Sequence, residues 1–339
     1  MAYKKIKIAN LLSEFAVSEN ASDNVAQNAN LRAFKVLMNA LGVSMSEAQR
    51  LIDKGRLFCN GEVVSAKNEI LRGEIELISY ENAPRGQKPI FDNQNFAVFD
   101  KQSGILSHPN GRNCAYSLCD EIWHLYGAQA GVAHRLDRET SGLILVAKDK
   151  KTQTIFKTLF EKRLVKKEYL ALVSGQTPLE FSVDLPMNSA CDEVKTRMRL
   201  CPLSEGGKEA RTEFKRLCYF SEQDLLNLSR EIQLGKGFDF SKGASLLLAR
   251  PLTGRQHQIR LHLFASGFAI LGEPLYGLER ADIERILDKQ MSAFERVSLT
   301  GATRLCLHSN RLAFEFGGKS YDILSQRDIR AEFLRALSL

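Results

Sequence analysis

The sequence predicts a globular protein in two parts, each of which combines helices with strands. Three observations lead to this class. The chain has 339 residues, enough for two domains and a sizeable core. Its composition, 44% hydrophobic and 26% charged, excludes a disordered or fibrous protein. Helical and strand-like spacings of apolar residues also recur along the chain, first in residues 31–80 and again from Ile90 to the C-terminus.

The first part begins with a polar stretch, residues 1–28, which we expect to form a poorly ordered arm. Apolar spacing then predicts a helix over Leu31–Leu41, closed by Gly42. The sequence at 44–47 is typical of a helix cap, so a second helix is expected over Ser46–Lys54.

Strands follow these two helices. Asn60 and Gly61 mark the turn of a hairpin over residues 56–64, and 75–78 supply another strand. The expected organisation is an arm (1–28), a small domain (29–80), a linker rich in proline (81–89) and a larger domain (90–339). In the larger domain, apolar runs predict strands at 96–99, 143–147, 169–173 and 246–249, and helices at 151–162 and 253–263. Residues 219–243 and 279–303 carry no motif and are interpreted as insertions.

The charge distribution favours an acidic partner. The net charge is +7, and residues 131–168 alone hold ten Lys or Arg against five Asp or Glu. The segment from Arg250 to His262 contains three arginines and no acid. Nucleic acid is the commonest partner of such a surface.

The cysteines indicate a reducing compartment. Seven are scattered along the chain without a C-x-x-C pair, which argues against a disulfide framework or a zinc ribbon. The N-terminus lacks the apolar core of a signal peptide, and no apolar run approaches the roughly 20 residues that span a bilayer. We therefore expect a cytoplasmic protein with no membrane association.

One run, His134–Lys148 (HRLDRETSGLILVAK), carries the strongest chemical signal. It places the carboxylate of Asp137 between Arg135 and Arg138 in a polar turn that leads into a buried strand. Nearby guanidinium groups favour the ionised carboxylate. Such a group suits a nucleophile or an electrostatic catalyst acting on a polyanion, or else an ion pair that only holds the turn.

Four segments in chain order decide between these alternatives: 100–109 (DKQSGILSHP), 134–148, 166–173 (KKEYLALV) and 252–262 (LTGRQHQIRLH), the last continuing through 272–277 (GEPLYG). Together with a closing strand around His308, residues 90–316 resemble the ribosomal large-subunit type of pseudouridine synthases. The small domain resembles the alpha-L (S4-type) RNA-binding motif through 42–52 (GVSMSEAQRLI), Gly55-Arg56 and Asn60-Gly61. It departs from that motif at Arg32-Ala33-Phe34, where the family has arginine-leucine-aspartate.

The resemblance implies an α+β fold: a mixed, mainly antiparallel sheet with flanking helices in the catalytic domain, beside a small α/β RNA-binding domain. It also implies isomerisation of specific uridines to pseudouridine in RNA. That reaction breaks an N-glycosidic bond and rejoins the uracil through carbon 5, without a metal or other cofactor. A single ionised carboxylate suffices, acting on the sugar carbon or on a sugar proton, and the sequence leaves both routes open.

By the same resemblance, Asp137 is the catalytic carboxylate, Arg255 its ion-pair partner, and Tyr169 the aromatic residue that stacks on the target base. Arg135 would fill the gap left by the flipped nucleotide. The remaining expected RNA contacts, mostly to phosphates, are Arg138, Lys148, Lys166, Lys167 and Arg260 in the larger domain, and Arg50, Lys54 and Arg56 in the small one.

Alternatives remain for both substrate and class. Large-subunit ribosomal RNA is the expected target, with transfer RNA second, and the enzyme is expected to be a monomer. A non-catalytic RNA-binding assembly factor would keep the fold without the activity. A nucleoside or glycoside hydrolase would need a second carboxylate, for which only Glu139 is near in sequence. The histidines lack metal-ligand spacing and are expected to make structural hydrogen bonds: His134, His257, His262 and His308.

Overall fold

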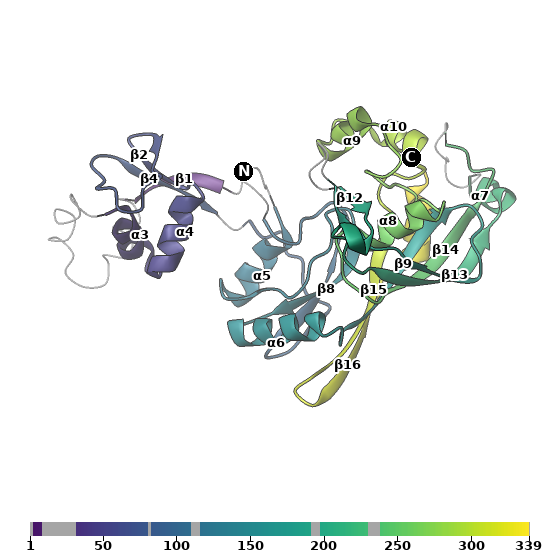
Figure 1. The fold of residues 1–339 in the computed structure, drawn as a ribbon, viewed down its shortest axis with the longest axis horizontal. Coiled ribbons are helices and arrows are strands. Elements are labelled where there is room, and N and C mark those ends of the chain that lie inside the picture. Colours follow the sequence, from purple (N-terminus) through teal and green to yellow (C-terminus); the bar gives the residue numbers. More distant parts are fainter. Residues whose placement is uncertain are drawn as a thin grey trace. The chain divides into compact units, whose positions relative to one another are not determined.

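The computed structural model describes residues 3–8, 32–80, 83–109, 116–190, 197–229 and 238–338. The chain forms two compact units, residues 1–84 with 109–116, and 85–108 with 117–339 (Figure 1). The part of the expected arm from 9 to 28 lies outside the described residues. The expected linker is shorter than predicted, because Arg85 and Gly86 donate their backbone N–H groups to the carboxylate of Glu121 and so belong to the larger unit.

The small unit has the predicted helices, hairpin and strand, plus one strand that was not predicted. Ser44 and Glu47 form a reciprocal capping box, and Asn60 and Gly61 both have positive φ, as a two-residue hairpin turn requires. Its elements are β1 (Tyr3–Lys7), α3 (Ala33–Leu41), α4 (Met45–Asp53), β2 (Leu57–Cys59), β3 (Glu62–Val63) and β4 (Ile75–Tyr80), with strand order β1-β4-β2-β3.

The prediction of a poorly ordered arm is wrong for residues 3–7. They form β1, which pairs antiparallel with β4. The alternation of lysine with isoleucine explains this: Lys5 pairs with Glu76 (3.1 Å), while Ile8 just beyond the strand is buried in the core of the unit. A period of two is the strand signal, and here it spans too few residues to stand out from the polar sequence that follows.

The larger unit is built on one mixed sheet. In the described part of the chain it has ten strands, antiparallel except where β15 runs parallel to β8. Its main order is β10 (Glu180–Asp184), β13 (Arg211–Phe220), β14 (Ala244–Pro251), β9 (Lys166–Ser174), β15 (Leu307–Phe316), β8 (Ser141–Ala147), β6 (Phe96–Lys101) and β5 (Phe91–Asp92), with β16 (Lys319–Leu324) beside β15 and β7 (Gly131–Val132) beside β8. The expected mixed, mainly antiparallel sheet is confirmed.

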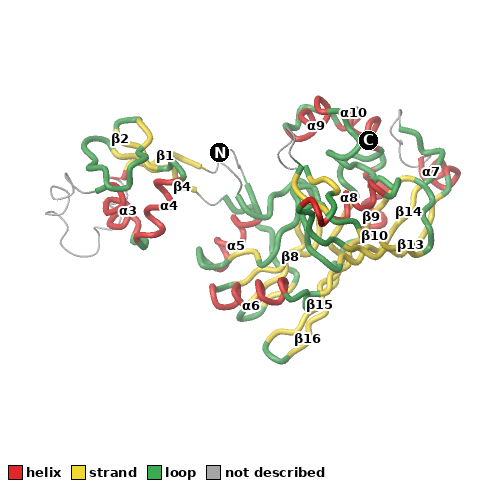
Figure 2. Tube along the Cα trace, viewed as in Figure 1, coloured by secondary structure: helices red, strands yellow, loops and turns green. Residues whose placement is uncertain are grey.

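Helices and loops flank this sheet (Figure 2). The apolar run of β8 is buried on both faces: Ile144 and Val146 pack in the core that includes α5, α8 and α11, whereas Leu143 and Leu145 pack in the core that includes α6. The helices are α5 (Leu118–Tyr126), α6 (Lys150–Glu161), α7 (Glu222–Ser229), α8 (Gln258–Ala265), α9 (Arg280–Leu287), α10 (Ala293–Thr300) and α11 (Ile329–Ala336), and a separate hairpin joins β11 (Met187–Ser189) to β12 (Met198–Leu200). None of the described helices is long and apolar enough to cross a membrane.

Candidate active site

The loop that carries Asp137 connects β7 to β8, and hydrogen bonds to the segment 100–109 hold it in place. The Ser107 hydroxyl donates to the Leu136 carbonyl (2.9 Å) and accepts from the Leu136 N–H (3.2 Å). The Gly104 N–H donates to the carbonyl of Arg138 (2.8 Å). Two motifs separated by about thirty residues in the sequence therefore form one rigid support for Asp137.

Lys101 completes this support from inside the protein. Its side chain is fully buried, and its Nζ donates to the carbonyl oxygens of Gln102 (3.0 Å), Ile105 (2.8 Å) and Arg138 (3.2 Å). Burial lowers the pKa of Lys101 to about 7, against the attraction of Asp137. Lys101 does not line the cavity and holds the backbone of the loop through these carbonyl oxygens.

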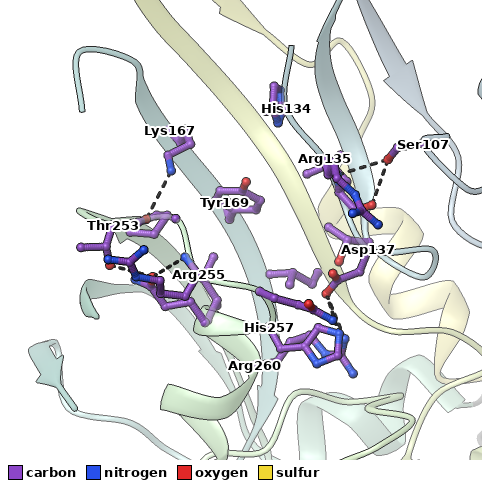
Figure 3. Close-up of a pocket in the computed structure, with 18 of the residues that line it drawn as sticks. Ser107, His134, Arg135, Asp137, Lys167, Tyr169, Thr253, Arg255, His257 and Arg260 are labelled. Carbon is purple, nitrogen blue, oxygen red and sulfur yellow. Dashed lines mark hydrogen bonds and ion pairs between the residues drawn. The ribbon is translucent and has the colours of Figure 1, made fainter. Parts of the chain in front are cut away.

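The side chain of Asp137 faces a cavity of about 1240 Å³, to which the motif segments contribute (Figure 3). In it, Asp137 pairs with Arg260: Nη1 lies 2.9 Å from Oδ2. Arg260 is 3% exposed and is held in turn by Glu273, with Nε–Oε2 at 2.8 Å and Nη2–Oε1 at 2.5 Å. Burial raises the pKa of Asp137, but the neighbouring His257 and Arg260 outweigh it and hold the pKa below its ordinary value. Asp137 is therefore an anion at neutral pH.

The prediction that Arg255 is the ion-pair partner is wrong, as is the prediction that Arg260 contacts phosphates. Arg255 precedes α8, and its Nε donates to the carbonyl of Glu209 (3.0 Å). Arg260 lies in the first turn of α8, on the face buried against Asp137. The two arginines share one acid-free segment, and the position at which the helix begins decides which of them reaches the carboxylate.

Tyr169 lines the same cavity from β9 and is 9% exposed (Figure 3). The structure thus places the residue predicted to stack on the base at the cavity that Asp137 faces. Burial raises its pKa to about 12, so the phenol is protonated. An anion, a phenol and a buried guanidinium thus meet in one concave site.

Comparison with known proteins agrees with this geometry. Residues 95–265 match the family described as RNA pseudouridylate synthase, and residues 31–75 match the S4 domain. A Helicobacter pylori protein named as an uncharacterized RNA pseudouridine synthase is 34% identical over 311 residues, which cover 91% of this chain and 94% of that protein. The chain belongs to the RNA pseudouridylate synthase family. It is thus an isomerase, with an S4 domain at its N-terminal end.

More distant relatives differ in the substrate that their names state. A ribosomal large subunit pseudouridine synthase D of Nitrosomonas europaea is 32% identical, covering 58% of this chain and 51% of that protein. A mitochondrial tRNA pseudouridine(32) synthase of Saccharomyces cerevisiae is 31% identical, covering 67% of this chain and 46% of that protein. A solved structure, human RNA pseudouridylate synthase domain containing 1, matches this chain with a TM-score of 0.52 at 20% identity. The match covers 71% of this chain and 83% of that one and shows a similar fold.

The cationic residues predicted for the synthase fall into two groups. Arg135, Lys166 and Lys167 line the cavity, with Arg135 and Lys166 exposed. Lys167 is half-buried and donates to the Thr253 carbonyl (3.3 Å), and burial lowers its pKa to about 8. These three side chains add positive charge to the lining of the cavity.

The other two cations of this domain have structural partners. Arg138 lines the cavity, but its guanidinium donates twice to the carbonyl of Leu287 at the end of α9 (3.2 and 3.1 Å). Lys148 does not line the cavity; it pairs with Asp92 (2.5 Å) and lies over the ring of Tyr126. The structure thus gives the ammonium of Lys148 partners outside the cavity, and its contact with RNA stays a prediction.

In the small unit, Arg50, Lys54 and Arg56 lie close together at the end of α4 and the turn after it. Burial and then the charges of Arg56 and Arg50 lower the pKa of Lys54. The three cations thus form a patch of positive charge at this end of α4.

Sequence reasoning assigned His257 a structural role only, but the structure brings its Nε2 to 3.7 Å from Oδ2 of Asp137. Its φ of +56°, uncommon for a residue with a side chain, starts α8 and turns the imidazole toward the carboxylate. The other histidines do serve structure. His134 Nε2 accepts from the Leu145 N–H (3.1 Å), His262 bonds Thr212 (3.0 Å), and His308 bonds Ser141 (2.9 Å).

Proposed function

We propose that this synthase isomerises uridine in large-subunit ribosomal RNA as a monomer, with Asp137 as the catalytic carboxylate. The observation that carries the proposal is the ionised Asp137 in a cavity that is also lined by Tyr169 and by the cations Arg135, Lys166 and Lys167.

The ion-pair contacts of the Asp137 carboxylate reach one of its two oxygens. Arg260 and His257 both approach Oδ2, so Oδ1 is the atom oriented for the substrate. A stacked base cannot reach such a site, and flipping the nucleotide out of its helix costs a few kcal/mol. At about 1240 Å³ the cavity exceeds the roughly 300–1,000 Å³ of ordinary small-ligand sites, as a flipped nucleotide with part of its strand requires. Attack on the sugar carbon and abstraction of a sugar proton both begin from this anion.

The arrangement favours isomerisation over hydrolysis. A glycoside hydrolase uses two carboxyl groups across the bond, one of which manages water. In the described part of the chain, the other carboxylates that line the cavity have cationic partners: Glu139 pairs with Arg296 (2.8 Å), Glu168 with Arg250 (2.8 Å) and Glu161 with Lys157 (3.8 Å). Among the described residues, no acid free of a cationic partner lines the cavity beside Asp137 to activate water, so a detached uracil can recombine with the sugar.

The ribosomal target rests on two supports. The small unit carries a cationic patch that suits a structured RNA, and several relatives are named as ribosomal large-subunit synthases. The deciding experiment maps pseudouridine in total RNA of cells that lack the gene, complemented with wild type or with Asp137→Asn. We expect a large-subunit site that is lost on deletion and restored only by wild type. Loss confined to transfer RNA would move the substrate there, and restoration by Asp137→Asn would remove the catalytic role.

Lys167 gives the RNA affinity a pH dependence. With a pKa of about 8, its ammonium is charged at pH 7 and mostly neutral at pH 9. We expect wild-type affinity to fall by up to about tenfold over this range, because a bound phosphate favours the protonated form. Lys167→Arg stays charged throughout and should bind equally at both values. Fluorescence anisotropy at constant salt measures this, and parallel curves for the two proteins would contradict it.

Arg50 should contribute to affinity without affecting chemistry. For Arg50→Ala we expect weaker RNA binding, a slope of log affinity against log salt reduced by about 1, and an unchanged single-turnover rate at saturating enzyme. Lys35→Ala, which removes an exposed cation on α3, is the matched control. An equal effect of the two substitutions would show that the patch at the end of α4 has no special role.

A further inference from the structure

We propose that Tyr276 is a positioning residue of the synthase: it fixes the proton of His257 on Nε2, so that this N–H points at Asp137. The inference rests on the catalytic role proposed above for Asp137. Tyr276 does not line the cavity, and its hydroxyl acts on the carboxylate through His257.

The contacts of the Tyr276 hydroxyl favour one direction for its hydrogen bond to His257. The backbone N–H of Met198 donates to the Tyr276 oxygen (3.3 Å), since an N–H can only donate. The single phenolic proton of Tyr276 is then available to His257 Nδ1, 3.2 Å away. A neutral imidazole whose Nδ1 accepts must carry its proton on Nε2. Nε2 is the atom that faces Asp137 Oδ2 at 3.7 Å.

His257 is neutral at physiological pH. Burial lowers its pKa to about 4, against the attraction of Asp137. The tautomer therefore matters: a proton on Nδ1 would turn the Nε2 lone pair toward a carboxylate oxygen and repel it. At 3.7 Å the contact is longer than a hydrogen bond, as catalytic contacts often are before substrate binds.

Tyr276 is itself firmly placed. It is 6% exposed, its ring stacks on Phe264 (5.9 Å between centroids), and the guanidinium of Arg260 lies 5.6 Å from its centroid. Its ring meets His257 edge to face, at 6.0 Å between centroids. The same residue thus orients both groups that approach Oδ2. Its contact with Met198 also ties the β11–β12 hairpin to the active site.

The consequence for catalysis is a fixed carboxylate. With Oδ2 held by Arg260 and His257, the orientation of the Asp137 carboxylate is fixed. Its other oxygen, Oδ1, then points into the cavity in one direction. Tyr276→Phe removes the hydroxyl and keeps the ring, so we expect kcat to fall about tenfold with KM within twofold of wild type, the loss that one net hydrogen bond produces.

The first readout is independent of activity. The chain has six histidines, so ¹⁵N-histidine labelling gives six imidazole patterns in NMR spectra, and the His257 pattern is identified by its absence in His257→Gln. We expect wild type to show the proton on Nε2 and Tyr276→Phe to show a mixture of tautomers. A wild-type proton on Nδ1, or an unchanged tautomer in Tyr276→Phe, overturns the proposal.

The second readout is a double-mutant cycle. If Tyr276 acts through His257, the variant His257→Leu/Tyr276→Phe should lose no more kcat than His257→Leu alone. Losses that multiply would overturn the proposal. Tyr126→Phe is the matched control, since its hydroxyl bonds Asp92 (2.9 Å) outside the cavity, and it should change neither the tautomer nor kcat. Full activity of Asp137→Asn would instead refute the catalytic role of Asp137, and the tautomer result would stand by itself.

Discussion

Replacing Asp137 with asparagine is expected to give a folded, RNA-binding protein that forms no detectable pseudouridine. The amide has nearly the same shape as the carboxylate, but it is neither a nucleophile nor a base at neutral pH. We expect a loss of at least about 10⁴-fold in the single-turnover rate, the scale seen when the reacting group of an enzyme is removed. The measurement is pseudouridine formation on an RNA that contains the mapped site, with enzyme in excess.

The structure explains why this variant should remain folded. Without the charge of Asp137, Arg260 still keeps both of its hydrogen bonds to Glu273. The backbone of the loop is held by Ser107 and Lys101 through carbonyl oxygens, which the substitution leaves intact. The thermal midpoint and the RNA affinity should therefore stay close to wild type. A rate within tenfold of wild type would rule out Asp137 as the catalytic group.

Much of this site could be predicted because its parts are local in sequence. Asp137 lies in a polar turn before an apolar strand, and Tyr169 follows a basic pair at the start of another strand. The structure places both at one cavity, where β8 and β9 each pair with β15. The capping box at Ser44 and the turn at Asn60 are local signals of the same kind.

What could not be predicted depends on where side chains point or on contacts between distant residues. The choice between Arg255 and Arg260 depends on the first residue of α8. The role of His257 depends on its left-handed backbone, which a histidine adopts too rarely for the sequence to indicate it. Neither is visible in composition or spacing.

The segment 279–303 shows the same limit. It was interpreted as an insertion without a motif, yet it forms α9 and α10, which reach the loop that carries Asp137. Leu287 offers its carbonyl to Arg138, and Arg296 pairs with Glu139. These partners are separated by about 150 residues, and one of the contacts uses a backbone atom, so no local pattern could have indicated them.

Arg260→Ala should have the second-largest effect, on stability and on chemistry together. The substitution leaves Asp137 and Glu273 facing a buried gap without their shared cation. Removing one partner of a buried ion pair costs about 3–5 kcal/mol of unfolding free energy, so the thermal midpoint should fall by several degrees. Arg260→Lys keeps the charge but cannot bridge both carboxylates. Its thermal midpoint and its rate should therefore lie between those of wild type and those of Arg260→Ala.

The pH dependence separates the chemical effect of Arg260 from a loss of fold. In wild type, Arg260 helps hold the pKa of Asp137 below its ordinary value against burial. Without the guanidinium, burial raises that pKa, so the fraction of ionised Asp137 falls as pH drops. The rate of folded Arg260→Ala should thus be lowest at acidic pH and recover in part as pH rises, while the wild-type rate stays flat over the same range. Arg255→Ala, which loses only a bond to the Glu209 carbonyl, should keep the wild-type profile. A shifted profile in Arg255→Ala and a flat one in Arg260→Ala would assign the ion pair to Arg255 in the working enzyme.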